Sequence, residues 1–83
     1  MKILVVDDHV LIREALRGIL GELDPDAVLI EAADADRAAR CLDEHPDLEL
    51  ILLDLSLPDR DGFELLLAWR ERRPTVSVFV LSA

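Results

Sequence analysis

The fold of this chain is decided by residues 3–8, which read Ile-Leu-Val-Val-Asp-Asp. A short, unbroken apolar run rich in β-branched residues predicts a strand that is buried on both faces. Two aspartates end the run, so they mark the carboxyl end of that strand. The pattern returns at residues 48–53, a second apolar run that ends in Asp54.

Between these runs the apolar residues recur with the period of a helix. Residues 11–23 predict a helix with its apolar stripe on Leu11, Ala15, Ile19 and Leu23 and with Ile12, Leu16 and Leu20 beside it. The charged residues Arg13, Glu14, Arg17 and Glu22 are expected on the opposite, solvent-facing side. Further helices are predicted from Asp34, as N-cap, to Pro46 and over residues 63–73, and further strands over 27–31 and 76–81.

Strands therefore alternate with helices along the whole chain, joined by connections of a few residues. This order predicts an α/β fold, with a doubly wound parallel sheet and right-handed crossovers. With 83 residues, the chain is expected to form one domain, 1–83, with a thin core.

Composition excludes several classes of function. Eighteen acidic against nine basic residues give a net charge of −9, which disfavours direct binding of nucleic acid or acidic membranes. No apolar run reaches the length of a membrane span, and the N-terminus does not have the pattern of a signal peptide. A lone Cys41 cannot form an internal disulfide. We therefore expect a cytoplasmic location.

Ligands of open parallel sheets gather outside the carboxyl ends of the strands. There the sequence places Asp7 and Asp8 after the first strand, Asp54 after the third, and Ser82 after the fourth. Clustered carboxylates repel one another unless a cation neutralises them, and an all-oxygen ligand set suits Mg²⁺. A carboxylate beside such a metal can act as a nucleophile toward phosphorus. The pattern predicts a Mg²⁺-dependent phosphoryl acceptor.

Three segments carry a family resemblance: residues 5–9 (Val-Val-Asp-Asp-His), 54–62 (Asp-Leu-Ser-Leu-Pro-Asp-Arg-Asp-Gly) and 80–83 (Val-Leu-Ser-Ala). Together they resemble the response-regulator receiver domain of two-component signalling. The Asp-Asp-His triplet followed by residues 13–16 is similar to receivers that precede a LuxR-type helix-turn-helix output domain. The resemblance implies a flavodoxin-like (CheY-like) sheet of order 2-1-3-4, with the family's fifth strand and last two helices lacking.

The resemblance also implies roles for individual residues. Asp54 matches the phosphoacceptor, and Asp7 and Asp8 match the acidic pair that binds Mg²⁺ together with Asp54. Ser56 matches the position whose backbone carbonyl is a further metal ligand, and Ser82 matches the hydroxyl that turns toward the phosphoryl group. The phosphoryl donor would be a sensor histidine kinase. Phosphorylation would switch the conformation of the chain and so control an output domain that acts in transcription. The chain would not be an enzyme.

Two other interpretations stay open. The chain can be an interaction or dimerisation module that does not use phosphate, or, with weaker support, a Mg²⁺ phosphohydrolase. For His9 we favour an ordinary first-turn helix residue over a metal ligand. In the expected order the fourth strand forms an open edge, so we predict a homo-oligomer, through pairing at this edge or by swapping of elements.

Overall fold

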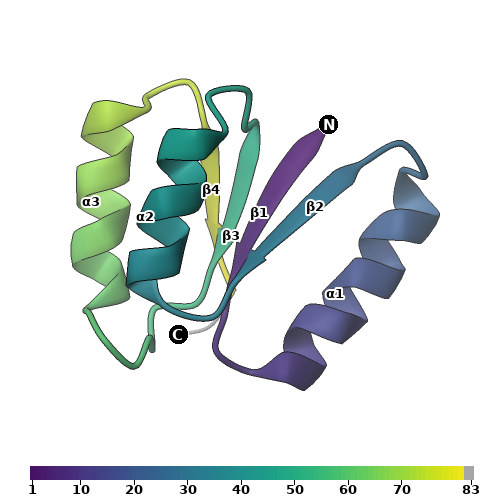
Figure 1. The fold of residues 1–83 in the computed structure, drawn as a ribbon, viewed down its shortest axis with the longest axis horizontal. Helices are drawn as coiled ribbons and strands as arrows, with labels where there is room; N and C mark the ends of the chain where they lie inside the picture. The colour runs from purple at the N-terminus through teal and green to yellow at the C-terminus, as the bar shows by residue number, and fades with distance from the viewer. Residues whose placement is uncertain (82–83) are drawn as a thin grey trace.

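The computed structural model describes residues 1–81, which form one parallel sheet with helices on both faces (Figure 1). The strands are β1 (Lys2–Val6), β2 (Val28–Ala32), β3 (Leu50–Leu53) and β4 (Ser77–Val80). The helices are α1 (Val10–Leu23), α2 (Ala35–Glu44) and α3 (Gly62–Arg72). The predicted α/β class and the alternation of elements are confirmed.

The sheet has the strand order β2-β1-β3-β4, and all its neighbouring strands are parallel. This confirms the order 2-1-3-4. The register sets Val6 of β1 beside Ala32 of β2 and Leu53 of β3, so these three strands end at one level. Among the described residues, β4 is an edge strand.

The larger core lies between the sheet and the helices α2 and α3. Alternate strand residues, such as Leu4 of β1 and Ile51 of β3, point into it and are fully buried. The helices contribute Leu42 from α2 and Trp69 from α3. Arg73, at the end of α3, donates hydrogen bonds from its guanidinium to the backbone carbonyls of residues 42, 45 and 46. It thereby satisfies carbonyl groups at the C-terminus of α2.

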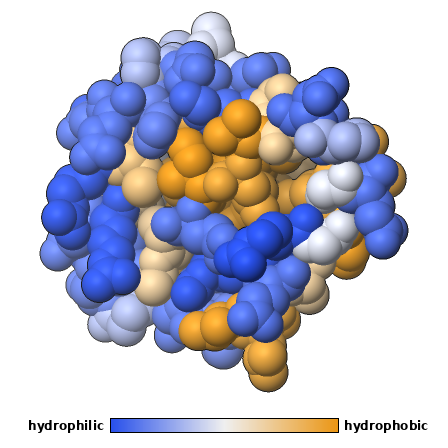
Figure 2. All heavy atoms as spheres, turned by 45° about the vertical axis from the view of Figure 1, so that its right-hand side comes forward, coloured by the Kyte–Doolittle hydropathy of each residue, from blue (hydrophilic) through white to orange (hydrophobic). Residues whose placement is uncertain are grey.

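Of the helices in the described residues, α1 alone covers the opposite face of the sheet, as Figure 1 shows. Among residues 1–81, the buried residues of this second core are Ile3, Val5 and Leu52 alone. No residue of α1, all of which the structure describes, is buried. Figure 2, which turns the α1 side forward, shows a broad hydrophobic area on the surface there. The thin core expected from the chain length is therefore thinnest on this face.

The prediction of which face of α1 packs on the sheet was wrong. Leu11 and Leu23 are each 77% exposed, and Leu16 and Leu20 pack on the sheet instead. The leucines bury apolar surface there, and Arg13 and Arg17, expected on the solvent side, both pair with Glu31 of β2. Arg13 shares a helix face with Leu16 and Leu20, so this face combines apolar packing with an ion pair to β2.

Within the part of the chain that the structure describes, none of the helices is both long and apolar enough to cross a membrane.

Two leucines in helices allow this uneven packing to be tested. Leu42→Ala should lower the free energy of unfolding by about 2–5 kcal/mol, because it opens a cavity in the α2–α3 core. Leu11→Ala should change it by less than about 0.5 kcal/mol, because the side chain is already in solvent. Urea unfolding followed by circular dichroism measures both, and equal losses would contradict the placement of α1.

Candidate functional site

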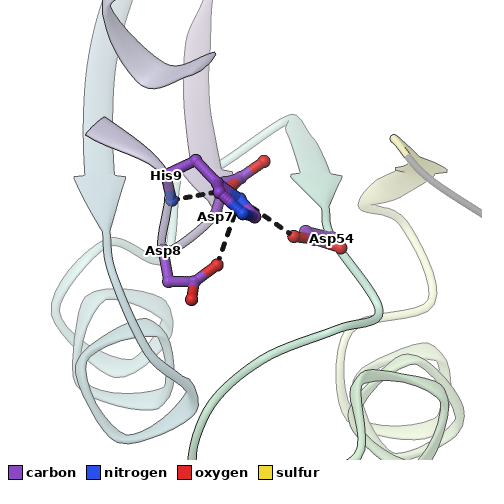
Figure 3. A group of neighbouring side chains, drawn as sticks. All are labelled: Asp7, Asp8, His9 and Asp54. Carbon is purple, nitrogen blue, oxygen red and sulfur yellow. Dashed lines mark hydrogen bonds and ion pairs between the residues drawn. The ribbon is translucent and has the colours of Figure 1, made fainter. Parts of the chain in front are cut away.

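Pairing of β1 with β3 brings the predicted acidic residues together. Asp7 and Asp8 follow β1 directly, and Asp54 follows β3, whose last residue is in register with Val6. The pairing continues one step beyond the strands, because the Asp54 amide donates to the Val6 carbonyl at 2.9 Å. Figure 3 shows the three carboxylates around one point at this end of the sheet.

Two of these carboxylates are buried, which is unusual for charged groups. Asp7 is 4% exposed and Asp54 is 3% exposed. A buried carboxylate is stable only with hydrogen-bond donors or cations near it. The Asp7 side chain accepts the His9 amide at 2.8 Å, and Asp54 Oδ1 accepts the Ser56 amide at 2.9 Å. The local turns after both strands thus orient the two side chains.

The imidazole of His9 enters this acidic group. Its Nδ1 lies 2.6 Å from Asp7 Oδ1, 3.2 Å from Asp8 Oδ1 and 3.7 Å from Asp54 Oδ2. The hydrogen bond with Asp7, and next the negative charge of Asp8, raise the pKa of His9 above its usual value. We expected an ordinary helix residue here, so sequence reasoning missed this contact. Its one signal was a histidine directly after two acids.

Arg13 is a second residue whose connection to the site was missed. Its guanidinium Nη1 donates to the Asp7 carbonyl at 2.6 Å, and its Nε donates to Glu31 at 3.2 Å. The guanidinium therefore ties α1 to the backbone of an acidic site residue and to β2. It also places a fixed positive charge beside the Asp7 backbone carbonyl. Nothing in the helical pattern of the sequence distinguished it from the other surface arginines.

The loop after Asp54 is held at several points. Ser56 forms an antiparallel bridge with Asp61, and Asp61 caps α3 by accepting the Phe63 amide. Asp59 crosses to the start of α2, where its two oxygens accept the amides of residues 35 and 36. The hydrogen bond from Ala35 holds the pKa of Asp59 below its usual value.

Gly62 closes this loop against its own beginning. Its amide donates to the Leu55 carbonyl at 3.1 Å. A Cβ at position 62 would lie only 2.5 Å from Leu55 Cα and 2.7 Å from Leu55 O. Both are backbone atoms, so the loop would have to move to admit any side chain.

Of the predicted site residues, Asp7, Asp8 and Asp54 lie together. The Ser56 backbone amide donates to Asp54, whereas the predicted role of the Ser56 carbonyl as a metal ligand stays a prediction. Ser82 lies outside the described residues, so its placement stays a prediction too.

The donor atoms of the group fit a single divalent cation. One ligand atom from each of Asp7, Asp8, His9 and Asp54 lies within 4.8 Å of all the others. Three carboxylates supply the oxygen ligands that Mg²⁺ prefers, and their mutual repulsion favours a cation between them. The residues present therefore fit a Mg²⁺ site formed by Asp7, Asp8 and Asp54.

Comparison with known proteins places the chain among signalling domains. Residues 3–83 match the family model described as response regulator receiver domain. The chain is 42% identical over 82 residues to the glycerol metabolism activator of Pseudomonas putida, and this match covers 99% of the chain. It spans only 37% of that relative, and 36–38% of the other relatives compared.

Solved structures show the same fold. The signal receiver domain of a DNA-binding response regulator from Colwellia psychrerythraea has a TM-score of 0.90 at 22% identity, over 100% of this chain and 68% of its own. RcsB from Salmonella enterica serovar Typhimurium, solved on promoter rprA with the phosphomimetic BeF3⁻, has a TM-score of 0.87 at 27% identity. That match covers 99% of this chain and 68% of RcsB.

Two glycines test the closure of the Asp54 loop. Gly62→Ala should destabilise the protein by about 1–3 kcal/mol, because the new methyl group meets the Leu55 backbone. Gly21→Ala in α1 meets no atom within 4 Å and should stabilise it by up to about 1 kcal/mol through helix propensity. Thermal unfolding measures both, and a neutral Gly62→Ala would show that the loop has room there.

Proposed function

This chain belongs to the response regulator receiver domain family, and we propose that residues 1–83 form a single receiver domain that accepts a phosphoryl group on Asp54. The observation that carries the proposal is the position of this carboxylate. It is buried at the end of β3, with Oδ1 fixed by the Ser56 amide and Oδ2 turned toward His9 and the acidic pair. One oxygen is thus held while the other faces the site.

In the proposed reaction, a carboxylate oxygen of Asp54 attacks the phosphorus atom of the donor. A new O–P bond forms as the bond from phosphorus to the leaving group breaks, and the leaving group takes the electron pair. Such a transfer depends on positioning and charge neutralisation more than on acid or base chemistry. Asp7, Asp8 and Asp54, with the Ser56 carbonyl, would hold Mg²⁺, which supplies that neutralisation when bound.

Receiver domains act with sensor histidine kinases, so we propose a kinase phosphohistidine as donor and a cytoplasmic location. The relatives named above are an activator and a promoter-bound regulator, which favours control of transcription as the output. Residues 1–83 carry a net charge of −9, so contact with DNA would fall to another domain. The chain would then be a switch rather than an enzyme.

The loop contacts suggest how the switch would act. A phosphoryl group adds about −1.5 to −2 charges and three acceptor oxygens at Asp54. The following loop is tied to α2 through Asp59 and to α3 through Asp61, so a movement at its start reaches both helices. The Ser82 hydroxyl would follow the new oxygens, as the family resemblance implies.

Phosphorylation can be measured directly. With Mg²⁺ and a small phosphodonor such as acetyl phosphate, intact-mass spectrometry should find one phosphoryl adduct on the wild-type chain. Asp54→Asn should abolish the adduct, because the amide is a far weaker nucleophile than the carboxylate. Removing Mg²⁺ with a chelator should suppress the adduct as well.

The matched control is Asp61→Asn, which keeps a capping side chain in the same loop and should keep the adduct. An adduct that survives Asp54→Asn would refute the assignment of the acceptor. No adduct on the wild type would favour the alternative function, an interaction module that does not use phosphate.

That alternative is favoured by one observation, the exposed edge at β4. Ser77 and Leu81 donate their amides to β3, so the backbone groups of Val78 and Val80 face away from the sheet. Phe79 lies beside Leu52 on the α1 face and is 63% exposed. An exposed apolar edge strand pairs readily with another strand. We propose that a second copy of the chain occupies it, by edge pairing or by swapping.

Self-association of residues 1–83 can be followed by sedimentation at micromolar concentration. The wild type should sediment as a dimer or larger species, and Phe79→Lys should shift it to monomer, because a charge at an edge blocks pairing. Leu11→Lys adds the same charge to an equally apolar exposed position on α1 and should have little effect. A monomeric wild type would refute pairing at β4.

A further inference from the structure

The side chain of His9 points toward the three carboxylates of the site. It is the N-cap residue of α1, yet its side chain makes no capping hydrogen bond. The ring instead turns into the acidic group, where Nδ1 lies within 3.7 Å of an oxygen from each of the three aspartates (Figure 3). The main chain of His9 is fixed there, because its amide donates to Asp7 Oδ1.

The four donor atoms are close enough together to surround one small ion, although His9 Nδ1 and Asp7 Oδ1, now hydrogen-bonded at 2.6 Å, would have to separate slightly. Ligand bonds of about 2.0–2.3 Å place opposite ligands roughly 4.0–4.6 Å apart. The donor atoms of the group all lie within 4.8 Å of one another. The His9 side chain is 62% exposed and the Asp8 side chain 36%, which leaves both of them room to turn toward an ion.

A nitrogen in this set changes which ions the site prefers. Mg²⁺ takes oxygen ligands, whereas imidazole nitrogen suits first-row divalent transition ions, whose affinities for such sites rise from Mn²⁺ toward Ni²⁺ and Cu²⁺. This inference rests on the proposed metal site. We infer that His9 Nδ1 is a direct metal ligand there, together with the three carboxylates, and makes the site bind divalent transition ions. Loss of the imidazole should then change the affinity for Mg²⁺ little.

The nitrogen ligand can be observed by spectroscopy, without any phosphoryl transfer. Pulsed electron paramagnetic resonance on the 83-residue chain with bound Mn²⁺ should show coupling to a ¹⁴N nucleus. His9→Ala and His9→Gln should both lose this coupling. His45→Ala is the matched control, because His45 lies beside Lys2 at the other end of β1, and it should keep the coupling.

Calorimetry supplies the second readout. His9→Ala should weaken Co²⁺ and Ni²⁺ binding by at least about tenfold, because loss of a residue that only supports a metal ligand already costs that much. Its Mg²⁺ affinity should stay within about twofold of wild type, since Mg²⁺ depends on the oxygens. His45→Ala should leave all three affinities unchanged.

Each contrary result is distinct. If Mn²⁺ binds the wild type without ¹⁴N coupling, or binds His9→Ala as well or better, His9 is no ligand and the inference is overturned while the carboxylate site stands. If the wild type binds neither Mg²⁺ nor Mn²⁺, the proposed metal site itself fails, and this inference fails with it.

Discussion

The parallel pairing of β1 with β3 is the constraint on which the site depends. It continues past the last residues of both strands through the hydrogen bond from the Asp54 amide to the Val6 carbonyl. This pairing leaves two buried carboxylates, on Asp7 and Asp54, at the same edge of the sheet. Like charges at such a place are unfavourable without donors or cations. The backbone amides of His9 and Ser56 and the His9 ring all lie where they reduce that cost.

Most of the fold and the acidic group could be predicted because they follow from local patterns. Apolar runs gave the strands, and the rule that ligands gather at carboxyl ends joined Asp7, Asp8 and Asp54 before any contact was known. Asp34 also caps α2 as predicted, by accepting the Arg37 amide. These features depend on residue type and order along the chain.

What could not be predicted depends on contacts between elements. The apolar residues of α1 surround much of the helix, so periodicity alone did not fix which side faces the sheet. The face that packs on the sheet carries Leu16 and Leu20, and its orientation also lets Arg13 and Arg17 pair with Glu31 of another element. The direction of the His9 ring was equally hidden, because a rotamer near three carboxylates is a property of the assembled site. The hydrogen bond from the Ala35 amide of α2 to Asp59 joins residues 24 positions apart.

The weak attachment of α1 has a further consequence for dynamics. Helices that bury little open at low free energy, and their amides exchange with solvent early. In this chain α1 would be such a unit, whereas α2, α3 and the sheet would exchange only on wider unfolding. The acidic group straddles the boundary: Asp54 belongs to the slowly exchanging body, while Asp8 and His9 lead into α1. Fraying of one helix would therefore take apart half of the site while the other half keeps its native protection.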